Sequence, residues 1–173
     1  MCMIRIAQHP LYAHPLPEGH RFPMLKYELL PEQLKREGTC SPAQFFNPTK
    51  LDNATILLTH CETYIEKLNN LKLSKKEARR IGFPVSENLI LREHVIVQGT
   101  LMGCEYALSN GIAFNIAGGT HHAFFDRGEA FCLLNDQAIA ANHLLHTKKA
   151  SKILIIDLDV HQGNGTAALF ENN

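Results

Sequence analysis

The chain has 173 residues, 45% of them hydrophobic, and its 17 basic and 17 acidic side chains leave no net charge. This length suits one domain with a sizeable core. The balanced charge argues against nucleic acid or a membrane surface as a direct partner, because proteins that bind them usually carry a basic excess. No apolar run is long enough to span a membrane and the N-terminus lacks a signal-peptide pattern, so we expect a cytoplasmic protein. The five cysteines are scattered and form no CxxC pair, which argues against a disulfide framework.

The first part of the chain predicts short elements between irregular segments. Residues 3–7 alternate as in a short strand, and residues 9–23 are rich in proline, glycine and histidine, which predicts irregular structure. A short helix is expected to end near Arg36, and Ser41-Pro42 predicts the start of another. Residues 54–59 fit either a short strand or a helical turn.

Helices are predicted for the middle of the chain. Apolar residues three and four apart predict a helix over residues 61–71, and the basic run at residues 72–80 is expected to be a solvated turn and helix face. Ser86 is the predicted N-cap of a long helix, which Asn110-Gly111 ends through a left-handed residue.

The last third of the chain alternates strand and helix. Strands are predicted over residues 112–116 and 153–156, with a helix over residues 135–146 between them. The four branched apolar residues at 153–156 are typical of a strand buried on both faces. This alternation indicates an α/β protein with a parallel sheet, in which ligands bind beyond the carboxyl ends of the strands.

Polar residues with chemical potential follow both of these strands. The first group is Gly118-Gly119-Thr120-His121-His122, where a Gly-Gly turn lets both imidazoles face one cleft. The second group is Asp157-Leu158-Asp159-Val160-His161, whose alternation places two carboxylates and an imidazole on one side. Oxygen and nitrogen ligands without a thiolate suit catalytic zinc or a related divalent ion. Gly163 and Gly165 let the following backbone fold tightly around the bound group.

Two long motifs carry a resemblance to a known family. The stretches GGTHHAFFDRGEAFCLLND and ILIIDLDVHQGNGT resemble the histone deacetylase family, which includes acetoin-utilisation proteins and acetylpolyamine amidohydrolases. HQGNG and PLPEGHRFPMLKYELL look closest to bacterial and class IV members. The resemblance implies the arginase/deacetylase fold, a three-layer α/β/α arrangement around a parallel sheet. Residues 1–173 are then expected to be the N-terminal part of a single deacetylase domain.

The resemblance also implies roles for residues of the two motifs. Asp159 and His161 match two of three zinc ligands, which ferrous iron also accepts. His122 matches the general base and acid, and His121 matches its electrostatic or orienting partner. Asp157 matches the carboxylate that steadies His121 and helps to bind a structural potassium ion.

Further resemblances concern the substrate channel and the second histidine. Phe131, together with Gly119, is assigned to the acyl-lysine channel. The sequence Gly-Glu-Ala before Phe131 departs from the commoner Gly-Xaa-Gly. Asn164 stands where some relatives have an aspartate facing the second histidine. Because a neutral amide does not stabilise an imidazolium, we expect His122 to be the more easily neutral of the pair.

Several alternatives remain open from the sequence. Arginases need an aspartate at the position of Gly163, so the motif favours a single metal and amide deacylation. Acetyl-lysine in proteins, an acetylated polyamine or a longer acyl amide all fit as substrate. Relatives continue beyond this sequence and supply there a third metal ligand and an oxyanion-binding tyrosine. The alternative to an enzyme is therefore a catalytically incomplete fragment or degenerate relative, acting as a binding or assembly module that forms a homo-oligomer through the exposed edge at residues 153–156.

Overall fold

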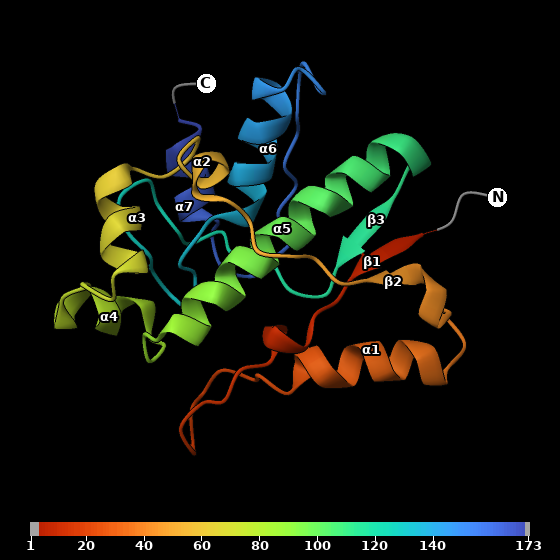
Figure 1. Cartoon of the computed structure of the whole chain (residues 1–173), viewed down its shortest axis with the longest axis horizontal. Helices are drawn as coiled ribbons and strands as arrows, with labels where there is room; N and C mark the ends of the chain where they lie inside the picture. Colours follow the sequence, from red (N-terminus) through yellow and green to blue (C-terminus); the bar gives the residue numbers. More distant parts are fainter. Residues whose placement is uncertain (1–3, 172–173) are drawn as a thin grey trace.

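A computed structural model of the chain describes residues 4–171 (Figure 1). Its sheet has three parallel strands in the order β2-β1-β3, with β1 at Arg5–Ala7, β2 at Phe45–Phe46 and β3 at Ala113–Asn115. In register, Ile6 of β1 lies opposite Phe45 on one side and Phe114 on the other. The parallel sheet therefore confirms the predicted fold class. Residue 3 of the predicted first strand lies outside the described residues, as does Cys2.

Most helices lie where the sequence predicted them, but the short helices at Pro10–Tyr12 and Asn164–Leu169 were not predicted. Residues 54–59, which the sequence left undecided, begin within a helical turn, and Ser41-Pro42 starts a short 3₁₀ helix. No helix within residues 4–171 is both long enough and apolar enough to cross a membrane. The 3₁₀ helices are η1 at Pro10–Tyr12 and η2 at Pro42–Gln44, and the α-helices are α1 at Lys26–Arg36, α2 at Asn53–Ile56, α3 at Glu62–Asn69, α4 at Lys75–Ile81, α5 at Glu87–Asn110, α6 at Asp136–His146 and α7 at Asn164–Leu169.

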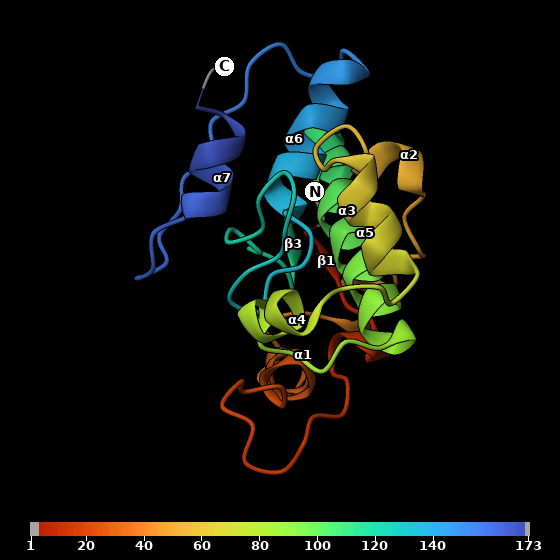
Figure 2. The same cartoon turned by 90° about the vertical axis from the view of Figure 1, so that its left-hand side faces the viewer.

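Helix α5 is the central scaffold of the fold. Its N-cap is Ser86, whose side chain accepts the backbone N–H of Leu89, and its C-cap is Gly111, where φ is +92°. Both ends lie where the sequence predicted them, because caps depend on a few neighbouring residues. The helix packs against β1, β3 and α6 and is buried over much of its length. Figure 2 shows α5 and α6 beside the strands, with α7 at the left-hand edge.

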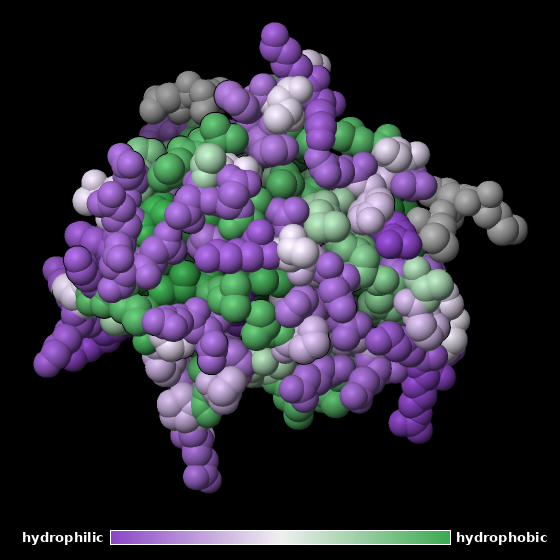
Figure 3. Space-filling view, viewed as in Figure 1, coloured by the Kyte–Doolittle hydropathy of each residue, from purple (hydrophilic) through white to green (hydrophobic). Residues whose placement is uncertain are grey.

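The hydrophobic core forms where α3, α4, α5 and α6 meet. Its fully buried side chains include Leu68, Ile81, Leu89 and Ile139. A smaller cluster joins the N-terminal segment to α5 through Tyr12 and Ile96. Polar side chains cover most of the face viewed in Figure 1, with apolar patches between them (Figure 3). The four described cysteines, Cys40, Cys61, Cys104 and Cys132, are all free.

The predicted strand at residues 153–156 is the main error of the sequence interpretation. This segment forms no strand pairing, and Leu154 and Ile156 are 81% and 70% exposed. A run of branched apolar residues indicates that a segment is suited to burial, but burial needs neighbouring strands and helices on both sides. Within residues 4–171, β3 pairs with β1 alone, and no strand lies next to residues 153–156.

Candidate active site

The turn after β3 brings two histidines to one cavity. Gly118 and Gly119 have φ values of +129° and +68°, a backbone conformation that side chains with a Cβ rarely adopt. The chain then reverses so that the rings of His121 and His122 meet edge to face, with centroids 4.2 Å apart. The Gly-Gly turn therefore places both imidazoles together, as the sequence predicted.

His121 is anchored by a carboxylate. Its side chain is buried, and Nδ1 lies 2.5 Å from Oδ2 of Asp157. The other oxygen of Asp157 accepts the backbone N–H of Asp159 at 3.0 Å. This backbone N–H, followed by the His121 imidazole, holds the pKa of Asp157 below its ordinary value. Asp157 is therefore a charged acceptor, which places the proton of His121 on Nδ1 and leaves Nε2 free.

His122 is anchored by a neutral amide instead. Its Nδ1 lies 2.7 Å from Oδ1 of Asn164, the first residue of α7. The backbone N–H of Gly165 donates to the same atom at 3.0 Å, which identifies that atom as the amide oxygen. Because an amide oxygen only accepts, Nδ1 of His122 carries a proton, so in the neutral ring it is Nε2 that has the lone pair.

Asp159 and His161 form a third polar group beside the histidines. Oδ1 of Asp159 accepts the backbone N–H of His161 at 2.7 Å and lies 2.9 Å from its Nδ1. The His161 backbone N–H, then its ring, hold the pKa of Asp159 below its ordinary value. The His161 ring lies 6.1 Å from that of His122. The expected convergence of three side chains thus holds for Asp159 and His161, whereas Asp157 turns away to His121.

Two glycines allow this segment to approach the histidine turn. A Cβ at Gly163 would lie 2.6 Å from Oδ2 of Asp157, closer than real side chains allow. A Cβ at Gly165 would lie 2.6 Å from the carbonyl oxygen of His121. The tight backbone that the sequence predicted for Gly163 and Gly165 is therefore present, and it presses the start of α7 onto the histidine turn.

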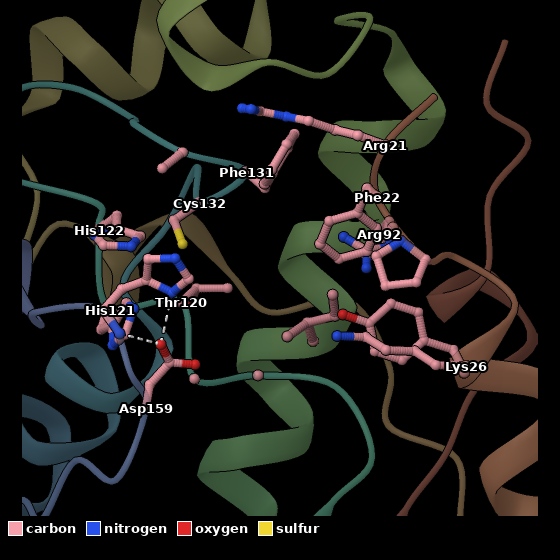
Figure 4. A pocket seen from close by; sticks show the side chains of 17 residues that line it. Arg21, Phe22, Lys26, Arg92, Thr120, His121, His122, Phe131, Cys132 and Asp159 are labelled. Atoms are coloured by element: carbon pink, nitrogen blue, oxygen red, sulfur yellow. Dashed lines mark hydrogen bonds and ion pairs between the residues drawn. The ribbon is translucent and has the colours of Figure 1, made fainter. Parts of the chain in front are cut away.

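The histidines open into a cavity of about 610 Å³. Figure 4 shows His121, His122 and Asp159 on one side, facing Phe22, Lys26 and Arg92 across the space. Phe131 and Gly119, which the resemblance assigned to the acyl-lysine channel, also line the cavity. The ring centroids of Phe131 and Phe22 lie 5.2 Å apart. The Arg21 guanidinium lies 4.8 Å from the centroid of the Phe131 ring.

The donors at the cavity fit a divalent cation in kind. Asp159 and His161 place a carboxylate oxygen and an imidazole nitrogen side by side, the ligand types of catalytic zinc. The Cys132 thiol also lines the cavity, but burial raises its pKa to about 12, so it stays protonated at neutral pH. Across residues 4–171 no third histidine, cysteine or carboxylate joins the pair, and catalytic zinc usually has three protein ligands.

Two buried polar groups near the cavity escaped the sequence interpretation. Arg92 of α5 lines the cavity, pairs with Glu93 and donates from Nε to the Tyr12 carbonyl at 2.7 Å. Asp136 lies behind the histidine turn and is 1% exposed. The available signal was that Arg92-Glu93 interrupts an apolar stretch of its helix. Asp136 lies in the first turn of α6, where acidic residues are common, so nothing in the sequence indicated that it is buried.

The chain is similar to known proteins over nearly its whole length. The Histone deacetylase domain matches residues 20–173. An uncharacterized protein of Picosynechococcus sp. is 44% identical over 97% of this chain, and Histone deacetylase 2 of Arabidopsis thaliana is 32% identical over 84%. An HDAC homologue solved in complex with SAHA has a TM-score of 0.83 and 25% identity over 98% of this chain. This chain spans 56%, 39% and 48% of the lengths of these three proteins.

These similarities establish the class of the protein. The parallel sheet and its match to the solved HDAC homologue define the arginase/deacetylase fold. The chain belongs to the histone deacetylase family. The resemblance inferred from the two motifs is therefore confirmed at the level of family and fold.

Proposed function

We propose that this chain carries the proton-transfer half of the active site of a metal-dependent deacetylase. The observation that supports this proposal best is the unequal anchoring of the two histidines. His121 rests on the carboxylate of Asp157 and His122 on the amide of Asn164, and both Nε2 atoms are left for the cavity that Asp159 and His161 line.

Asp159 and His161 are the residues that would hold the metal ion, zinc or ferrous iron, together with at least one further ligand. When bound, such an ion polarises an amide carbonyl and acidifies water. A potassium ion near Asp157 remains part of the proposal, in a structural role only.

The histidines then divide the proton chemistry between them. Nε2 of His122 accepts a proton from the attacking water and returns it to the departing amine. Asn164 supports this cycle because it accepts from Nδ1 without favouring a permanently charged ring. His121, held in place by Asp157, presents its Nε2 to the cavity and acts as the orienting and electrostatic partner of His122.

The substrate proposed is an acetylated amine on an extended chain, such as acetyl-lysine or an acetylated polyamine. Phe22 and Phe131 supply apolar ring faces along the cavity, which suit a chain of methylene groups. That a similar HDAC homologue was solved with SAHA supports ligand binding by this fold.

Hydrolysis and metal content, measured on one purified sample, test this function. Three substrates are compared: a fluorogenic acetyl-lysine peptide, an acetylated polyamine and a longer acyl-lysine peptide. We expect hydrolysis that a chelator abolishes and that His122→Ala removes, while His146→Ala, a change of an exposed histidine on α6, leaves it intact. A sample with one equivalent of zinc that hydrolyses none of the three substrates would contradict the proposal.

A second candidate function rests on the exposed segment before His161. Leu154, Ile156, Leu158 and Val160 are 81%, 70%, 92% and 91% exposed on an extended, unpaired backbone. Such a row of apolar residues on a free edge favours strand pairing between chains. Sedimentation velocity would detect self-association. Its loss in Leu154→Lys but not in Leu108→Lys, at an exposed position on α5, would support an assembly function.

A further inference from the structure

We propose that Asp136 is a positioning residue that fixes the Gly118–His122 turn and thereby the two imidazoles. The consequence for catalysis rests on the proposed function, but the geometry does not. Asp136 is 1% exposed and does not line the cavity, so it contacts neither substrate nor metal ligand. It lies at the start of α6, within reach of both the histidine turn and α5.

The turn places its polar hydrogens around this carboxylate. Oδ1 of Asp136 accepts the backbone N–H of Thr120 at 2.8 Å and lies 2.7 Å from the Thr120 hydroxyl. Oδ2 accepts the backbone N–H of Gly119 at 3.2 Å. Two successive backbone N–H groups that point at one carboxylate fix the path of the chain immediately before His121.

Gly118 completes the enclosure of the carboxylate. Its φ of +129° is a conformation that favours glycine, and a Cβ there would lie 2.6 Å from Oδ2 of Asp136. The turn is therefore folded directly against the carboxylate, with no room for a side chain between them. The position of Asp136 and the shape of the turn consequently depend on each other.

A directional chain of hydrogen bonds ties Asp136 to α5 and to the N-terminal segment. The Tyr12 hydroxyl donates to Oδ1 of Asn115 at 2.8 Å, and Nδ2 of Asn115 donates to the Thr100 hydroxyl at 2.8 Å. Thr100 in turn donates to Oδ2 of Asp136 at 2.6 Å. Because each step has a fixed direction, Asp136 must be the acceptor at its end.

A neutral amide cannot replace this carboxylate. In Asp136→Asn one oxygen becomes an NH₂ group that faces N–H or O–H donors, so two donors would point at each other. The turn must then shift, and the hydrogen bond between His121 and Asp157 should break. We would measure the strongly downfield Nδ1–H proton of His121 by NMR at fixed pH, a signal that requires no activity.

The expected result is loss of this proton signal in Asp136→Asn and weakening in Thr100→Val, which removes one donor from α5. Thr59→Val is the control, because the hydroxyl of Thr59 is buried and, like that of Thr100, accepts a hydrogen bond from an asparagine side chain, here Asn142. It should keep the signal. An unchanged signal in folded Asp136→Asn, or in Thr100→Val if Asp136→Asn does not fold, would overturn the inference. If the signal responds as expected but the wild-type chain hydrolyses no acetyl amide, the proposed function fails while the positioning role stands.

Discussion

The position that a Cβ of Gly163 would occupy lies 2.6 Å from Oδ2 of Asp157, the oxygen that binds His121. The backbone of Gly163 has a φ of −73°, which any residue can adopt. Space beside the carboxylate, and not backbone freedom, is therefore the reason that a glycine is required here. The glycine keeps the carboxylate in contact with the imidazole.

Gly163→Ala should separate Asp157 from His121. The added methyl group must displace the carboxylate or the start of α7, so we expect kcat/KM for acetyl-lysine to fall roughly 10- to 100-fold. The downfield proton of His121 should weaken in the same variant. If Gly163→Ala keeps both full activity and that proton signal, the steric argument is wrong.

Two glycines of α5 should respond to alanine in opposite directions. A Cβ at Gly103 would meet only the Cβ of Ala113 at 3.8 Å, so Gly103→Ala should stabilise the fold by about 1 kcal/mol through helix propensity. A Cβ at Gly99 would collide with the Tyr12 hydroxyl and lie 2.9 Å from Nδ2 of Asn115. Gly99→Ala should therefore destabilise by about 1–3 kcal/mol. Urea unfolding measures both changes, and an equal effect of the two substitutions would contradict the packing described for α5.

Ala130→Gly should stabilise the protein. Ala130 has a φ of +45°, a left-handed conformation that costs a residue with a Cβ about 1 kcal/mol. Its backbone N–H donates to the Arg80 carbonyl, which holds this conformation in place. Glycine relieves the strain, so the free energy of unfolding should rise by about 0.5–1 kcal/mol. Ala140→Gly in the interior of α6 is the control and should lower it by at least about 1 kcal/mol, because it reduces helix propensity and removes a buried methyl group.

Asn164→Ala should change the tautomer of His122. Without the amide oxygen, Nδ1 loses its acceptor, and the proton can move to Nε2, the atom needed as a base. Nitrogen-15 NMR of the imidazole should show a larger Nε2–H population, and hydrolysis should fall by roughly tenfold or more. Asn164→Asp keeps an acceptor at this position and should retain the original tautomer. A tautomer that is the same in all three proteins would contradict the assignment.

His60 should contribute to a loss of stability as the pH falls below neutrality. Burial lowers its pKa to about 4 from 6.5, although the Phe124 carbonyl that accepts from its Nδ1 opposes the shift. Between these two values the unfolded chain binds a proton that the folded chain lacks, so stability falls as the pH falls. At pH 5 the loss should be about 2 kcal/mol.

Chemical denaturation at pH 7 and pH 5 measures this dependence. His60→Gln should clearly reduce the difference in the free energy of unfolding between pH 7 and pH 5. His146→Gln, at an exposed position, should leave this difference unchanged. An identical pH dependence in His60→Gln and in the wild type would show that other groups cause it.

Helix ends and the histidine partners were accessible from the sequence because their causes are local or belong to long motifs. Ser86 and Asn135 cap their helices by accepting N–H groups three residues ahead. Asn164 was expected to face His122, and the structure places it there. The metal roles of Asp159 and His161 stay predictions, since only their proximity is established.

The remaining features depend on residues far apart in the chain. A strand at 153–156 needs a neighbouring strand, and no local pattern reveals whether one is present. Asp136 reads as an ordinary acidic residue at a helix start, yet it accepts hydrogen bonds from a turn 16 residues earlier. Arg92 forms a buried ion pair with Glu93, and it also donates to the carbonyl of Tyr12, which lies 80 residues earlier in the chain. Such groups become visible only when the fold brings the segments together.

The bond from Tyr12 to Asn115 joins residues 103 positions apart, and the network that it begins ends at Asp136. Contacts of such large sequence separation form late in folding, because closing a long loop costs entropy before any contact compensates for it. The hydrogen bond of His121 likewise needs Asp157, which lies 36 residues further along the chain. During synthesis on the ribosome, Asp157 follows all the helices that build the core around α5, so we expect that core to form before the two histidines are ordered.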